Sequence, residues 1–104
     1  MKISGSKPNP LTHNKKMFCF HVLRSKKDGD LYFGYSANLK QRLNEHNLGK
    51  IASTKNRKPF DLVYYEAYKN EDEARNRKLQ IKKRAGALIG LKRRIKKSIS
   101  SEGV

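Results

Sequence analysis

Three polar side chains in the first half of the chain have the types and spacing expected of a site that handles phosphodiesters. Tyr32 opens the run Tyr32-Phe33-Gly34, Arg42 follows ten residues later, and His46 follows after a further four. Arg42 and His46 are one helical turn apart, so one face of a helix would present both. A planar guanidinium matches phosphate oxygens, and Tyr32 could supply a phenolic oxygen beside a glycine that permits close backbone approach.

The charge of the chain would attract a polyanion. It has 25 Lys and Arg against 9 Asp and Glu in 104 residues, with a formal net charge of +16. Two zones, Lys2–Lys16 and Lys82–Lys97, contain no acidic residue. Patches of this density usually bind nucleic acid and less often anionic lipid. We expect a nucleic-acid partner, with DNA favoured, and no membrane partner. The candidate contacts are Lys40, Lys55, Arg57, Lys78, Lys82, Lys83, Arg84, Arg93 and Arg94.

The length suits one domain. We expect a basic disordered tail over residues 1–16, the domain over 17–97, and a short flexible tail over 98–104. Cys19 is the only cysteine, so no intramolecular disulfide and no thiolate metal cage can form. Residues 1–17 lack the apolar core of a signal peptide. A cytoplasmic location is therefore expected.

Three strand-like and three helix-like segments must position these residues. Apolar runs on either side of an Asp-Gly pair predict a hairpin, and capping residues and Gly49 delimit the first helix. The order strand-strand-helix-strand-helix-helix predicts an α+β fold with a small, three-stranded, mostly antiparallel sheet flanked by helices. The expected strands are 17–24, 31–35 and 60–68, and the expected helices are one capped by Ser36 or Asn38 that runs to about 48, one over 70–83 and one over 87–99.

Two local expectations accompany this fold. In the third strand, strict alternation would place Leu62, Tyr64 and Glu66 on one side and the intervening residues on the other. Ala85 and Gly86 are expected to break the chain between the last two helices.

The run FHVLRSKKDGDLYFGYSANLKQRLNEHNLGK, followed by STKNRKPFDLVYYEAY, resembles the GIY-YIG nuclease superfamily. The resemblance is greatest to its small single-domain bacterial members, which are related in fold to the amino-terminal domain of excinuclease C, and it covers about residues 17–95. Tyr32-Phe33-Gly34 stands at the YIG motif, with Phe33 and Gly34 as its backbone, and Arg42 stands at the family arginine. This resemblance implies an endonuclease that hydrolyses nucleic-acid phosphodiesters with Mg²⁺ or Mn²⁺.

The resemblance also implies roles for individual residues. In the family, a tyrosine and a metal ion activate water, an arginine stabilises the phosphate, and a helix glutamate holds the metal. The catalytic candidates are Tyr32, Arg42, His46 and His21, the last of which replaces the tyrosine of the first motif. A histidine can also exchange a proton near neutral pH.

The metal-binding glutamate of the family falls on Lys78, so no metal ligand is identified. An ammonium cannot ligate Mg²⁺, which prefers oxygen ligands, and would repel it. Glu66 and Glu73 are weak candidates for a substitute.

Three functions agree with these residues. The first is an endonuclease impaired by Lys78, and the alternative is a non-catalytic DNA- or RNA-binding module on the same fold. In that module, Lys78 would contact phosphate where the family holds a metal. The third is a structural basic protein of a ribosome or nucleoid, which the basic tails favour and the motif residues disfavour.

Overall fold

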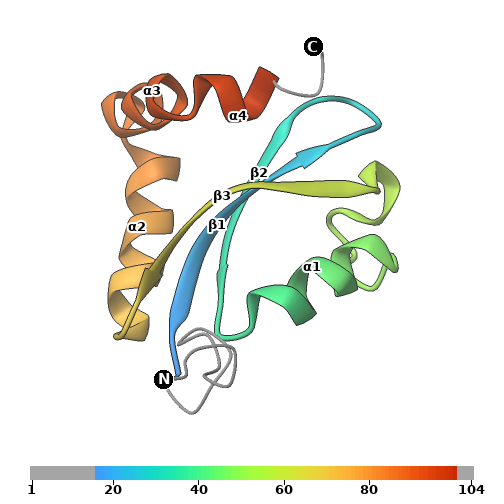
Figure 1. Cartoon of the computed structure of the whole chain (residues 1–104), viewed down its shortest axis with the longest axis horizontal. Coiled ribbons are helices and arrows are strands. Elements are labelled where there is room, and N and C mark those ends of the chain that lie inside the picture. Colours follow the sequence, from blue (N-terminus) through green and yellow to red (C-terminus); the bar gives the residue numbers. More distant parts are fainter. Residues whose placement is uncertain (1–15, 101–104) are drawn as a thin grey trace, which may run out of the picture.

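The computed structural model describes residues 16–100 as a three-stranded antiparallel sheet flanked by helices (Figure 1). The strand order is β2-β1-β3, and α1 lies on one side of the sheet with α2, α3 and α4 on the other. The predicted α+β fold and element order are confirmed. The elements are β1 (Phe18–Ser25), β2 (Leu31–Ser36), α1 (Leu39–Asn47), the 3-10 turn η1 (Lys55–Arg57), β3 (Phe60–Tyr68), α2 (Glu71–Lys83), α3 (Ala85–Arg94) and α4 (Lys96–Ser100).

The predicted tails lie largely beyond this part of the chain. Residues 1–15 and 101–104 are outside the described residues, whereas residues 98–100 form the end of α4. No helix within residues 16–100 is long and apolar enough to cross a membrane.

The main core lies between the sheet and the α2–α3 pair. Phe20 and Val22, two residues apart on the central strand, have no exposed surface and pack with Ile81 of α2, Leu91 of α3 and Ile95. Because side chains alternate along a strand, the residues between them must point to the opposite face, toward α1.

That opposite face carries the predicted chemical residues. In the β1–β2 ladder His21 is paired with Gly34, and Leu23 is paired with Tyr32. Residues directly opposite one another in an antiparallel pair share a face. Strand pairing therefore brings the first-motif histidine and the tyrosine and glycine of the second motif to one surface of the sheet.

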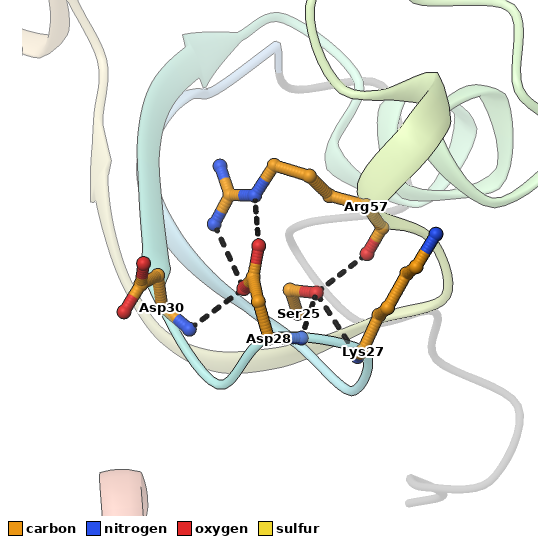
Figure 2. Close-up of polar contacts among 5 residues, drawn as sticks. All are labelled: Ser25, Lys27, Asp28, Asp30 and Arg57. Carbon is orange, nitrogen blue, oxygen red and sulfur yellow. Dashed lines mark hydrogen bonds and ion pairs between the residues drawn. The ribbon is translucent and has the colours of Figure 1, made fainter.

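The turn between β1 and β2 is joined to the loop that precedes β3 (Figure 2). The Ser25 hydroxyl donates to the Arg57 carbonyl at 2.5 Å and accepts from the backbone N–H groups of Lys27 and Asp28. Arg57 Nε donates to Asp28 Oδ2 at 2.8 Å. These bonds fix η1 against the hairpin, and Arg57, a predicted nucleic-acid contact, is engaged by a carboxylate.

The expected strict alternation in β3 is wrong. Val22 pairs with Tyr64, but the next residue, Leu23, pairs with Leu62, so Val63 is an extra residue between them. Both Val63 and Tyr64 consequently pack against the core. Such a bulge depends on the pairing of two strands, which a local pattern in one strand does not reveal.

The expected break at Ala85 and Gly86 is also displaced. Both residues belong to the first turn of α3, and the chain instead bends at Arg84, whose backbone is extended (φ −121°, ψ 109°). First-turn N–H groups have no intrahelical partner, so Gly86 interrupts no helical bond there. The single last helix expected from the sequence is divided into α3 and α4 at Ile95.

Glu66 joins β3 to α2. Its carboxylate accepts hydrogen bonds from the Tyr64 hydroxyl at 2.7 Å, the Tyr68 hydroxyl at 2.5 Å and Arg77 Nε at 3.0 Å. Burial alone would raise the pKa of Glu66, but the hydrogen bonds from Tyr68, Tyr64 and Arg77 outweigh it, and the pKa is lowered. Glu66 is thus committed to the fold and has no open position for a metal ion.

Glu66→Ala should lower the free energy of unfolding by about 2 kcal/mol, because it leaves a partly buried guanidinium and two hydroxyls without their acceptor. Urea unfolding at pH 7 measures this loss. Asp61→Ala is the matched control on the same strand, since its ion pair with Lys26 is exposed and exposed pairs contribute less than about 1 kcal/mol. Equal losses in the two variants would contradict the structural role of Glu66.

Candidate functional site

The rings of His21 and Tyr32 lie against Gly34 on the α1 face of the sheet, and the ring of His46 contacts Tyr32. A Cβ atom placed on Gly34 would lie 2.9 Å from His21 Nε2 and 3.4 Å from Tyr32 Cε2. The rings of Tyr32 and His46 meet edge to face, with centroids 5.0 Å apart. The structure therefore brings together three of the four predicted catalytic residues, and only glycine leaves room for the imidazole of His21.

The position of His46 is fixed by α1 and by the loop after it. Asn38 caps α1, its side chain accepting from the Gln41 N–H at 3.0 Å. His46 is fully buried, and its Nδ1 is 2.7 Å from the hydroxyl of Thr54, which is also buried. His46 Nε2 has no hydrogen-bond partner among the described residues. Burial and then the charge of Arg42 lower the pKa of His46.

His21 lies beneath the site as a neutral imidazole. It is 1 % exposed, and a polar contact with the Cys19 backbone opposes the effect of burial on its pKa. Burial and, to a smaller degree, the charges of His46, Arg42 and Lys78 lower its pKa from 6.5 to about 4. Arg42 of α1 and Lys78 of α2 are thus both close enough to act electrostatically on the same ring.

Cationic side chains approach this cluster from both faces of the sheet: Arg42 from α1, and Lys78 and Arg75 from α2 on the face that Tyr35 shares with its pairing partner Phe20. Arg42 is half-buried and pairs with Glu45 at 3.3 Å. Lys78 Nζ and Arg75 Cζ lie 5.7 and 5.8 Å from the ring centroid of Tyr35, the residue after the motif glycine. The guanidinium of Arg75 also donates from Nε to the Tyr35 hydroxyl at 3.3 Å.

Three residues of this region are not indicated by the sequence: Thr54, Tyr35 and Arg75. Thr54 lies in a polar loop with no spacing that singles it out. Arg75 precedes Lys78 by three residues, a spacing that places both on one helix face, but nothing local indicates that Tyr35 lies opposite.

Comparison with known proteins agrees with this arrangement. The family model of the GIY-YIG catalytic domain matches residues 17–97, most of the chain. The protein belongs to the GIY-YIG family. It is 43 % identical over 68 residues to a UPF0213 protein of Pediococcus pentosaceus, an alignment that covers 64 % of this chain and 70 % of that protein.

Other relatives have the same family name. The chain is 46 % identical over 57 residues to UPF0213 protein SH2523 of Staphylococcus haemolyticus, covering 54 % of this chain and 70 % of the relative. It is 39 % identical over 71 residues to the UPF0213 protein in the ldhD 5′ region of Pediococcus acidilactici, covering 65 % and 71 %. No solved structure matches the chain. The predicted GIY-YIG resemblance is confirmed.

The remaining predicted contacts are spread over several elements of this GIY-YIG domain. Lys40 is exposed on α1, and Lys55 is exposed on η1. Arg94, although exposed, hydrogen-bonds Tyr64. The other exposed cations are at the end of α2 and on α3: Lys82, Lys83, Arg84 and Arg93.

The residues that the structure describes do not form a site for a divalent metal ion. GIY-YIG nucleases generally use one, but the resemblance places Lys78 at the metal-glutamate position, and no group of three or more His, Cys, Asp or Glu within residues 16–100 could hold an ion. Glu45 pairs with Arg42, and Glu66 is committed to Arg77 and two tyrosines. Glu73 precedes Lys78 by five residues, which turns it by about 140° around α2.

The stability of the protein should fall as the pH falls through the range in which His21 titrates. The unfolded chain binds a proton near pH 6.5 and the folded chain only near pH 4, so the unfolded state binds more protons between these values. At about 1.4 kcal/mol per pKa unit, the lowered pKa of His21 reduces the free energy of unfolding by up to about 3 kcal/mol at pH 4. Urea unfolding at pH 7, 5.5 and 4.5 should show a smaller decline in His21→Gln. The same decline in both proteins would rule out this origin.

Gly34→Ala should destabilise the protein by about 1–3 kcal/mol, because the added methyl group would meet His21 Nε2 at 2.9 Å. Gly90→Ala is the matched control. An added Cβ there meets nothing within 4 Å, and alanine in a helix is favoured over glycine by about 1 kcal/mol. Thermal unfolding of both variants should therefore shift in opposite directions, and equal shifts would contradict the close approach at Gly34.

Proposed function

We propose that this GIY-YIG domain binds nucleic acid, with DNA as the favoured substrate, and hydrolyses its phosphodiester bonds. The observation that supports the proposal is the cluster of Tyr32, His46 and His21 around Gly34, with Arg42 acting on the two imidazoles. A proton-transfer group beside a guanidinium is what attack on a phosphodiester requires.

The burial pattern divides the roles. Tyr32 and Arg42 are only half-buried, so they are the groups that would contact the phosphodiester. Arg42 would exchange Glu45 for the non-bridging oxygens and stabilise charge that develops on them. His46, held by Thr54, and His21 are buried, so they would act through Tyr32 as positioning residues. None of these roles depends on a metal ligand.

The basic helices would hold the rest of the nucleic acid. The cations at the end of α2 and on α3 are exposed, and contacts from lysine and arginine to phosphates supply affinity without reading sequence. The location that we infer for this activity is the cytoplasm, which agrees with a lone, buried and reduced Cys19.

A second function, binding without cleavage, is favoured by one observation. Lys78 stands at the position where the family holds its metal, and it lies over Tyr35 beside a second cation, Arg75. A site of this charge can bind a phosphodiester without accelerating its hydrolysis.

Nicking of supercoiled plasmid tests the cleavage. The native chain should nick in at least one of three buffers containing Mg²⁺, Mn²⁺ or EDTA, and Arg42→Ala should reduce the rate by about 100-fold or more, the loss expected when a group that stabilises the transition state is removed. Lys27→Ala, which removes one exposed positive charge from the β1–β2 turn, should retain the native rate.

The other outcomes are equally informative. If the native chain nicks the plasmid and Arg42→Ala nicks it at the same rate, the proposed catalytic site is refuted. Absence of nicking in all three buffers, combined with DNA binding that weakens steeply with salt, would establish the binding function instead.

A further inference from the structure

We propose that the place on α2 where a GIY-YIG nuclease would hold its metal ion is, in this chain, a binding site for a phosphate oxygen of the nucleic acid, formed by Lys78 and Arg75 around Tyr35. The inference rests on the proposed binding of nucleic acid but not on cleavage. It adds that the contact is direct and needs no divalent cation.

The geometry of the site is built from two elements. Tyr35 on β2 is covered by two cations that are three residues apart on α2, with Lys78 Nζ 5.7 Å and Arg75 Cζ 5.8 Å from its ring centroid. The bond from Arg75 Nε to the Tyr35 hydroxyl, at 3.3 Å, orients the ring. The three side chains are half-buried, so they are partly ordered before a ligand arrives.

Of the three cations Arg42, Arg75 and Lys78, only Lys78 has no carboxylate partner within residues 16–100. Arg75 pairs with Asp72 at 2.7 Å and with Glu71 at 3.8 Å, and Arg42 pairs with Glu45. Within residues 16–100, no carboxylate lies within 4.0 Å of the Lys78 ammonium. A half-buried ammonium held by an aromatic face retains donors for an anion.

The charge of Lys78 reaches the centre of the site, since it contributes to lowering the pKa of His21. The positive charge of Lys78 over the Tyr35 ring is carried by a group that donates hydrogen bonds. A phosphate oxygen can bind an ammonium directly. Mg²⁺ would then act only as a competing counterion and weaken binding.

Binding of a fluorescent 12-nucleotide DNA single strand, measured by anisotropy in EDTA over a range of NaCl concentrations, tests the site. Lys78→Gln should weaken binding roughly tenfold at low salt and reduce the slope of log K against log [NaCl] by about 0.7, the share of one phosphate contact on a single strand. Lys78→Arg should retain most of the affinity. Lys69→Gln removes one exposed charge between β3 and α2 and should stay within twofold of the native chain.

A second measurement addresses the metal itself. Equimolar Mn²⁺ should cause no selective broadening of the Tyr35 ring signals in NMR spectra of the native chain, whereas Lys78→Glu should gain it, because a carboxylate is a suitable ligand. Selective broadening in the native chain, stimulation of binding by Mg²⁺, or identical behaviour of Lys78→Gln and Lys69→Gln would overturn the inference.

The binding and nicking results separate the two proposals. Lys78-dependent binding in EDTA without any nicking would refute cleavage alone. The opposite result would be nicking that depends on Arg42, together with binding that Mg²⁺ stimulates and that Lys78→Gln does not change. It would refute the phosphate site and leave the cleavage proposal intact.

Discussion

The arrangement of this domain depends on the position of β1 as the central strand. β1 pairs with a strand on each of its edges, and its side chains point alternately to the two faces of the sheet. One face carries the main core and the other carries the candidate site. Phe20 and Val22 supply the core beneath α2 and α3. His21, between them, is placed by the same alternation under the rings of the opposite face. A shift of one residue in the pairing would exchange the two sets, so the register specifies the core and the site together.

Electrostatics links these two faces. Both imidazoles are buried, which lowers their pKa values, and the charge of Arg42 on α1 acts on both while that of Lys78 on α2 acts on His21. These positive charges would destabilise a protonated histidine, and a bound phosphodiester would neutralise them. Cleavage and binding would thus depend on the same positive charges. They differ only in whether the group that attacks the phosphodiester can lose its proton.

Much of the fold followed from local patterns, because hydrophobic runs, an Asp-Gly turn and capping residues act over a few positions. The spacing of Tyr32, Arg42 and His46 likewise located part of the site. The bulge at Val63, the bond from His46 to Thr54 and the contacts of Tyr35 with α2 did not follow, because each depends on residues brought together by tertiary packing. Glu66 shows the same limit: its partners are defined by the contact between β3 and α2.

The hydrogen bonds between Arg57 and the residues Ser25 and Asp28 affect where new chain ends could be placed. They connect the β1–β2 turn to the loop that carries Thr54 (Figure 2). Thr54 in turn contacts His46. Circular permutants with new ends in this turn would weaken its link to the loop that carries Thr54. A cut in the bend at Arg84 would spare these contacts, which makes the two connections unequal as places for inserting another domain.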